Sequence, residues 1–152
     1  MQLTKHTDFG LRTLIYLALH PGRRVSTAEV AGVFGVPKNH LSKVVGQLAS
    51  GGFVRTFRGK GGGSMLGMPL NDIRVGAVVR HLEGEKEMIN CARPLCPAVP
   101  ACSLIDVMQQ AKAACLEVLD RYSLGDVVND HRQELDFLLT PTQPVNAHAR
   151  PN

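Results

Sequence analysis

No apolar run in this 152-residue sequence approaches the roughly 18–20 residues that a transmembrane helix needs, so the sequence excludes a membrane span. A secretory signal peptide is not expected either, because Lys5, Asp8 and Arg12 interrupt the apolar stretch near the N-terminus. No nucleophile–base constellation and no signature of a substrate pocket is present, so we do not expect an enzyme. These absences predict a cytoplasmic protein that has no membrane partner and acts by binding.

Acidic residues are scarce in the first half of the chain. Residues 1–80 hold eleven Lys and Arg but only three Asp and Glu, whereas residues 81–152 hold six and ten. The first half therefore has a net charge of +8 and the second half a net charge of −4. A basic half favours a polyanionic partner such as nucleic acid, and an acidic half indicates a different task.

Two helices are predicted near the N-terminus. Apolar residues recur at helical spacing over residues 7–19, and Thr7 is the predicted N-cap. A second helix starts at Ser26, which forms a capping-box pattern with Glu29, and it stops at Gly35. This second helix is short, and only a few residues separate it from the next one.

A third helix is predicted over residues 37–50, because a proline opens it and two glycines follow it. One face is apolar, and the opposite face is positive and rich in the amide and hydroxyl groups that bind base edges and phosphates. The second and third helices therefore read as a helix-turn-helix whose third helix contacts DNA. The residues of that helix expected to contact DNA are Lys38, Asn39, His40, Ser42 and Lys43, and Gln47 is predicted on the same face.

A β-hairpin is predicted directly after the helix-turn-helix. Residues 53–57 favour a strand, residues 58–63 form a glycine-rich turn, and residues 64–66 return. A hairpin in this position is the wing of a winged helix. Arg58 and Lys60 at its tip are expected to contact the minor groove or phosphates, since the glycines around them permit a close approach.

Beyond one more short helix at residues 75–82, the composition changes. The winged domain is therefore assigned to residues 1–82, and residues 83–102, which lack periodicity and contain three prolines, are assigned to an irregular loop. Residues 141–152 are rich in Pro, Asn and Ala and are predicted to be disordered.

A long helix is predicted to begin at Ser103 and to extend for about 20 residues, with one further turn at residues 123–128. Its apolar side needs a partner, and a second copy of the chain is the simplest one, since helix-turn-helix proteins commonly bind DNA as dimers. We therefore assign residues 103–130 to a homodimerisation region. Packing of this helix on the first helices of the same chain is the alternative.

Three of the four cysteines, Cys91, Cys96 and Cys102, lie in the proline-rich loop with the spacing Cys-x4-Cys-x5-Cys. In a reducing compartment such clustered thiols favour a metal site over disulfides. The wide spacing, and the lack of any histidine between residues 82 and 130, favour an iron–sulfur cluster over a structural zinc site. Cys115 lies apart, on the apolar side of the long helix, as a small hydrophobic residue.

Three cysteines leave one position of the cluster for another ligand or for a small molecule. The candidates are Asp106, in the first turn of the long helix, and Asp8, at the start of the first helix. His6, Glu85 and Glu87 are further candidates, and each fits a solvated side chain better.

Several stretches resemble the iron–sulfur winged-helix regulator family that contains IscR, and among its members the nitric-oxide-sensing repressors in particular. The resemblance covers about residues 1–140 and its motifs occur in the family's order. The stretches that carry it are residues 1–4, 7–12, 39–41 and 58–63 together with the cysteine loop.

The resemblance implies a homodimer in which Cys91, Cys96 and Cys102 of each subunit hold a cluster. In the nitric-oxide sensors an aspartate from the other subunit completes a [4Fe–4S] site, and Asp8 matches its position. IscR-type members use a histidine three residues after the third cysteine, where this chain has Ile105. A [2Fe–2S] cluster is the alternative, because some members hold one.

The sequence thus predicts a mostly α-helical chain with a small β-hairpin wing: a winged helix-turn-helix, a cysteine loop and a long dimerisation helix. The expected function is repression of transcription by binding palindromic operator DNA, with release when nitric oxide reacts with the cluster and derepression of nitric oxide detoxification genes. A regulator that senses cluster supply or redox state is the alternative. An iron–sulfur electron carrier and a zinc-stabilised module are less favoured.

Overall fold

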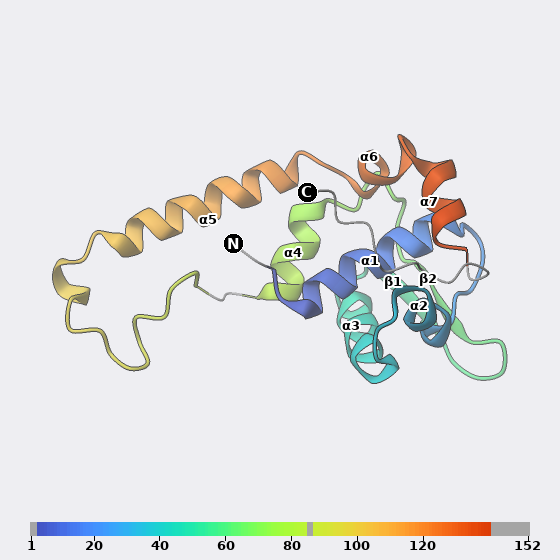
Figure 1. Cartoon of the computed structure of the whole chain (residues 1–152), viewed down its shortest axis with the longest axis horizontal. Coiled ribbons are helices and arrows are strands. Elements are labelled where there is room, and N and C mark those ends of the chain that lie inside the picture. Colours follow the sequence, from blue (N-terminus) through green and yellow to red (C-terminus); the bar gives the residue numbers. More distant parts are fainter. Residues whose placement is uncertain (1–2, 85–86, 141–152) are drawn as a thin grey trace, which may run out of the picture.

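The computed structural model describes residues 3–84 and 87–140 and shows a helical body with one β-hairpin and one long helix along its side (Figure 1). The fold class is therefore the predicted one. The predicted disordered tail, residues 141–152, lies outside the described residues. The elements in chain order are α1 (Lys5–Leu19), α2 (Thr27–Phe34), α3 (Lys38–Ser50), β1 (Val54–Phe57), β2 (Gly63–Leu66), α4 (Val75–Glu83), a 3-10 turn η1 (Val99–Ala101), α5 (Leu104–Asp120), α6 (Leu124–Asn129) and α7 (Arg132–Leu138).

The core lies where α1, α3 and α4 contact one another, and α6 covers α1 on another side. Each helix contributes one apolar stripe, as the helical spacing predicts. Fully buried side chains from these elements include Leu14, Leu41, Leu48, Val78 and Val128. This core fixes the orientation of α3, whose four buried residues all face it.

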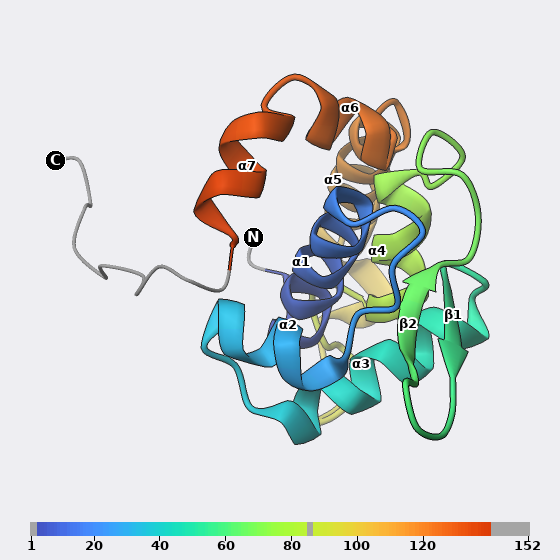
Figure 2. The same ribbon diagram turned by 90° about the vertical axis from the view of Figure 1, so that its right-hand side faces the viewer.

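The hairpin pairs β1 with β2 in antiparallel register, from Val54 opposite Leu66 to Phe57 opposite Gly63. Val25, just before α2, exchanges two backbone hydrogen bonds with Ser64, of 2.9 and 2.7 Å. The wing is thereby attached to the start of α2 as well as to the end of α3. In Figure 2, α3 and the turn of the wing lie along the same lower side of the molecule.

Two local predictions about helix ends are wrong. α1 begins at Lys5 with Thr4 as its N-cap, since the Thr4 hydroxyl accepts from the Thr7 amide, whereas the predicted cap Thr7 is fully buried inside the helix. The long helix α5 has 17 residues instead of about 20. It ends at Asp120 because the chain then turns so that the Val75 amide can donate to the Tyr122 carbonyl (2.9 Å).

The predicted turn at residues 123–128 is confirmed as α6, whose N-terminus carries a reciprocal capping box between Ser123 and Asp126. α7 was not predicted. None of the helices in the described ranges is long and apolar enough to cross a membrane.

Candidate DNA interface and cysteine loop

α2 and α3 are joined by a tight turn that sets the direction of α3. Gly35 ends α2 in the left-handed conformation (φ 62°), where a residue without a Cβ has no strain. The Val36 amide then donates to the Ala31 carbonyl (3.0 Å), and Pro37 occupies the N-cap position of α3, where its carbonyl accepts from the Leu41 amide (3.2 Å). Four buried residues, Leu41, Val44, Val45 and Leu48, hold α3 against the core.

The outer face of α3 carries the residues that the sequence predicted for DNA contact. Lys38, Asn39, His40, Ser42 and Lys43 are all exposed. The Ser42 hydroxyl donates to the Lys38 carbonyl (3.0 Å) within the helix, so its oxygen remains available as an acceptor. This face has two cations and no acidic residue, which suits a phosphate backbone.

Gln47 does not lie on that face, so its predicted placement is wrong. Its side chain is half-buried and bonded to His6 of α1 (2.7 Å) and to the backbone carbonyl of His81 of α4 (2.9 Å). The helical position between the buried Val44 and Leu48 turns Gln47 toward α1 and α4 instead of solvent.

The wing presents Arg58 and Lys60 at its tip, and both side chains are exposed. Gly59 and Gly61 have positive φ values of 86° and 79°, which L side chains rarely adopt. A Cβ at Gly62 would overlap the Phe57 carbonyl oxygen. The turn therefore requires its glycines, and they keep the two cations free of neighbouring side chains.

Two further cations lie at the wing and were missed by the sequence interpretation. The guanidinium carbon of Arg24 lies 4.3 Å from the centre of the Phe57 ring, and that of Arg55 lies 5.8 Å from it. Both side chains are exposed, and within the described ranges neither forms an ion pair. Together with Arg58 and Lys60 they make the wing strongly positive.

A hollow of about 430 Å³ separates the start of α2, the start of α3 and the wing. Its walls carry the hydroxyls of Ser26 and Thr27, the Lys38 side chain and the glycine-rich backbone of residues 61–63. Hydroxyl, ammonium and backbone amide groups are the ones that contact phosphate in protein–DNA complexes. The hollow thus lies between α3 and the wing and has these polar groups on its walls.

Arg23, the neighbour of Arg24, is engaged differently. Its guanidinium donates to both carboxylate oxygens of Glu29 (2.6 and 3.1 Å), and the Tyr16 hydroxyl donates to the same carboxylate (2.8 Å). Ser26 caps α2 through the Glu29 amide (3.1 Å). The predicted capping box is therefore only half correct, since the Glu29 side chain binds Arg23 and Tyr16.

These contacts shift the proton affinities of the three groups. Burial, and then the Glu29 carboxylate, raise the pKa of Tyr16 to about 12. The Arg23 hydrogen bonds lower the pKa of Glu29 and raise that of Arg23. The cluster holds the start of α2 against α1 and neutralises the Arg23 charge.

The cysteine loop turns repeatedly on itself. The Asn90 side chain accepts from the amides of Ala92 and Arg93 (3.1 and 3.0 Å), and the Cys96 amide donates to the Cys91 carbonyl (3.0 Å). The turn η1 follows and ends at Cys102. Cys91, Cys96 and Cys102 are each half-buried and free of disulfides.

The donor set of this loop fits an iron–sulfur cluster, because three free thiols stand on one irregular loop whose only helical segment is the short turn η1. The loop does not form a compact site for a single ion: within residues 3–84 and 87–140, no three His, Cys, Asp or Glu side chains are grouped to hold one. A multi-iron cluster is larger than one ion and its ligands stand farther apart.

The candidate fourth ligands lie on different elements, with His6 and Asp8 on α1 and Asp106 on α5. Asp8 is bonded to Arg12 (2.8 Å) and is 42% exposed; it lies on α1 in the winged body, whereas the cysteine loop forms the opposite extremity of the molecule (Figure 1). Asp106, in the first turn of α5, and Glu87 are exposed. His6 is bonded to Gln47, and Glu85 lies outside the described residues.

α5 leads from the cysteine loop back to the body, with α4 along it (Figure 1). Although α5 is described over its whole length, none of its side chains is fully buried. Leu104, Val107 and Val118 are 53%, 55% and 49% exposed. Packing on the same chain therefore leaves an apolar face on α5 open to water.

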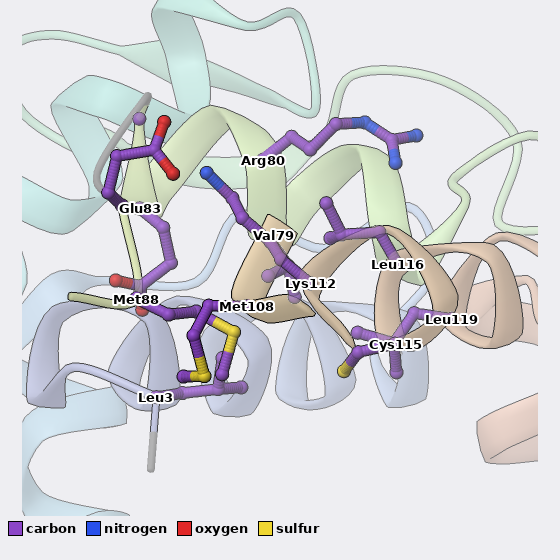
Figure 3. A pocket seen from close by; sticks show the side chains of 12 residues that line it. Leu3, Val79, Arg80, Glu83, Met88, Met108, Lys112, Cys115, Leu116 and Leu119 are labelled. Carbon is purple, nitrogen blue, oxygen red and sulfur yellow. The ribbon is translucent and has the colours of Figure 1, made fainter. Parts of the chain in front are cut away.

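A hollow of about 540 Å³ between α4 and α5 adds to that face. Figure 3 shows Leu3, Met88 and Met108 at one end of it and Cys115 with Leu119 farther along α5. Cys115 is half-buried here. Its surroundings are those of a hydrophobic contact residue and differ from those of the three loop cysteines.

The chain matches a known protein family and is similar to several solved structures. Residues 3–130 match the Rrf2 family, described as iron-dependent transcriptional regulators. The chain is similar to the solved structure of CymR, the global cysteine regulator of B. subtilis, with 27% identity, 86% of this chain and 98% of that chain covered, and a TM-score of 0.64. It is similar to T. potens IscR at 26% identity, with 88% and 90% covered and a TM-score of 0.68. The oxidised form of S. aureus CymR gives 28% identity, 84% and 95% covered, and a TM-score of 0.64.

Proposed function

Because the chain belongs to the Rrf2 family of transcriptional regulators, we propose that it is a repressor of the NsrR type. Regulators of this family bind DNA and are typically dimeric. In the proposed function the dimer holds an iron–sulfur cluster in each subunit, represses from operator DNA, and releases that DNA when nitric oxide arrives. The observation that carries the proposal is the trio of free, half-buried thiols on one loop of an Rrf2-family chain.

The proposed DNA contacts follow from the exposed cations and polar groups. Two copies of α3 enter successive major grooves of a palindromic operator, and its exposed face contacts bases and phosphates there. Each wing brings its cations to the flanking minor groove or backbone. The hollow between α2, α3 and the wing lies between these two contact regions and suits the intervening phosphates.

The proposed dimer buries the apolar face of α5 against a second copy. That face and the adjoining hollow are open in the single chain. A surface of this kind is costly to leave in water and is typical of an interface between subunits. Cys115 belongs to this interface in the proposal and takes no part in sensing.

In the proposed sensing site Cys91, Cys96 and Cys102 bind the cluster as thiolates, [4Fe–4S] being favoured over [2Fe–2S], and Asp8 of the partner subunit supplies an oxygen ligand. When bound, the cluster supplies iron that reacts with nitric oxide. The Asp8 carboxylate stays accessible beside Arg12, which supports a second contact. Asp8 would hold the cluster through a weak oxygen ligand, and release of that carboxylate would free the start of α1.

The first test is an anaerobic absorption and electron resonance spectrum of freshly purified protein. We expect iron–sulfur absorption that Cys96→Ser abolishes and the matched control Cys115→Ser retains, because Cys96 lies on the loop whereas Cys115 lies on α5. We also expect Asp8→Ala to weaken cluster retention while the protein stays folded. A colourless protein loaded with zinc would contradict the proposal.

The second test is a titration with nitric oxide while binding to a labelled operator duplex is followed. We expect affinity to fall as nitric oxide reaches stoichiometry with the cluster. Retained binding after full reaction overturns nitric oxide as the signal. The similarity to T. potens IscR favours a second candidate in that case, a regulator that responds to cluster supply or redox state.

A further inference from the structure

Three helices are joined by a set of hydrogen bonds centred on Gln47 of α3. His6 Nε2 lies 2.7 Å from Gln47 Oε1, and the Gln47 side-chain amide donates to the His81 carbonyl at 2.9 Å. In return, His81 Nε2 lies 2.7 Å from the Gln47 carbonyl oxygen. One residue of the reading helix is thus bonded to both α1 and α4.

The direction of each bond follows from its partners. The backbone carbonyl of His81 can only accept, so the amide nitrogen of Gln47 faces it and the amide oxygen faces His6. His6 and His81 must each carry a proton on Nε2, because each faces an oxygen that can only accept. Both side-chain groups of Gln47 are therefore used between helices, and neither is left for DNA.

Further contacts tie α1 and α4 to each other at the same place. The amide and hydroxyl of Thr4, the N-cap of α1, both donate to Glu83 Oε1 (2.8 and 2.9 Å) at the end of α4. A Cβ on Gly10 of α1 would overlap the Leu82 side chain, so the two helices pack as closely as a glycine allows. The His81 ring also packs edge-on against Phe53, with centroids 5.6 Å apart, directly after α3.

The two elements that Gln47 contacts are the ones that the sensing site would move. His6 lies two residues before Asp8 on α1, and His81 lies in the last turn of α4, which leads into the cysteine loop. A displacement of either element pulls on a residue in the middle of the DNA-reading helix. Gln47 is eight residues from Asn39 on one rigid helix, so a tilt at Gln47 moves the DNA-contacting end.

We propose that Gln47 is a positioning residue that couples the start of α1 and the end of α4 to the orientation of α3, and thereby to DNA affinity. The inference rests on the proposed function, since it supplies the mechanical step between the sensing site and the DNA-binding face. A coupling between two sites requires an element whose state both sites bias, and α3 held by Gln47 is that element.

The test uses a duplex selected from a random pool by the wild-type protein. Its dissociation constant is measured without air for the protein with its native cysteines and for Cys96→Ser, and the constant of Cys96→Ser divided by that of the native protein is the coupling ratio. Gln47→Met removes both side-chain bonds at nearly constant volume, and we expect it to bring the ratio down at least about fivefold, toward one. Gln47→Glu keeps the acceptor for His6 but opposes the His81 carbonyl, so its ratio should be intermediate.

Lys43→Ala is the matched control on the same helix, because Lys43 is exposed on the predicted DNA-contacting face of α3. We expect it to weaken binding in both states by the same factor and to leave the ratio unchanged. A second measurement needs no cluster: in the Cys96→Ser background, Gln47→Met should speed amide hydrogen exchange at the start of α1 and the end of α4, with no change at the turn of the wing.

The outcomes separate the two proposals. A wild-type ratio well above one that Gln47→Met leaves unchanged overturns the coupling role and leaves the proposed function standing. A wild-type ratio of one overturns sensing through the cysteine loop, and the coupling role with it. Faster exchange confined to α3 also contradicts the coupling role, because it would show that Gln47 stabilises only its own helix.

Discussion

Arg23 and Arg24 are neighbours in the sequence, yet the structure gives them opposite roles, and their alanine variants should separate cleanly. Arg23 donates to both oxygens of Glu29 and its charge is neutralised there. Arg24 lies over the Phe57 ring, next to the turn of the wing, with no acidic partner in the described ranges. Arg24→Ala should therefore weaken DNA binding, and Arg23→Ala should weaken the fold.

The expected change in DNA binding follows from counterion release. Each phosphate contact contributes about 0.9 to the slope of log affinity against log salt on duplex DNA. Both subunits of a dimer lose the contact in Arg24→Ala, so the slope should become shallower by about 1.8. Between about 50 and 200 mM salt, the wild-type protein should then lose about twelvefold more affinity than the variant.

The expected change in stability runs the other way. Arg23→Ala removes a half-exposed bidentate ion pair and one restraint on the carboxylate that accepts from Tyr16. Solvent screening limits this loss to about 1 kcal/mol, which corresponds to about 2–4 °C in the midpoint of thermal unfolding for a chain of this length. Arg24→Ala loses only an exposed cation–π contact, about 0.5 kcal/mol.

The assay is fluorescence anisotropy of a labelled duplex over a series of salt concentrations, together with thermal unfolding of the same preparations. We expect a shallower slope with near-normal stability for Arg24→Ala, and a wild-type slope with a lower midpoint for Arg23→Ala. The reasoning is refuted if Arg24→Ala keeps the full slope, or if Arg23→Ala reduces it equally. Either result would show that pairing with Glu29 does not determine which of the two arginines contacts DNA.

Three other predictions concern packing, self-association and pH dependence. Gly10→Ala, whose Cβ would overlap Leu82, should cost about 1–3 kcal/mol in urea unfolding, whereas Gly46→Ala, whose Cβ meets nothing within 4 Å, should not destabilise. Val118→Lys should weaken self-association about tenfold or more in sedimentation while leaving the monomer folded, because Val118 is half exposed in the single chain. Since the fold raises the pKa of Tyr16 from 10 to about 12, the stabilisation is complete below pH 10 and is lost as the pH rises toward 12; urea unfolding of Tyr16→Phe should show a flatter decline across that range.

The boundaries of the DNA-binding helices could be predicted because local chemistry sets them. Ser26 accepts from the amide three residues on, as the sequence indicated, and Gly35 takes the left-handed conformation that stops α2. Gly52 after α3 and Gly59 and Gly61 in the wing likewise take positive φ values. Where a helix end depends on one side chain or one backbone angle, no tertiary contact is needed to predict it.

The errors arise where distant contacts decide. Thr4 and Thr7 are both good N-caps, and the choice falls on Thr4 because its amide and hydroxyl also reach Glu83, 79 residues away. α7 was missed because seven residues are too few for a helical period to stand out, and it is held by Leu135 and Leu139 packing on the core. Neither contact leaves a local pattern.

Gln47 shows the same limit at the site itself. Its amide suits a DNA base edge as well as an interhelical bond, so spacing alone assigned it to the DNA face. Only the position of α1 and α4 shows that its bonds are already made. The charge count identified the basic half of the chain correctly. It could not show which of Arg23 and Arg24 is neutralised, because the position of Glu29 decides that.

The identity of the fourth ligand determines whether a change at the cluster would reach α1. Asp106 follows the cysteine loop directly, and as a ligand it would keep the sensing site within one subunit and leave α1 untouched. Asp8 lies in the first turn of α1, in the body, whereas the cysteine loop projects from it (Figure 1), and the proposal therefore assigns Asp8 to the loop of a partner subunit. Ligation by Asp8 would therefore draw α1 into the site, and the bond from His6 to Gln47 would carry that change to α3. Of the two carboxylates, only Asp8 would link the cluster, through the dimer contact and α1, to the DNA-contacting helix α3.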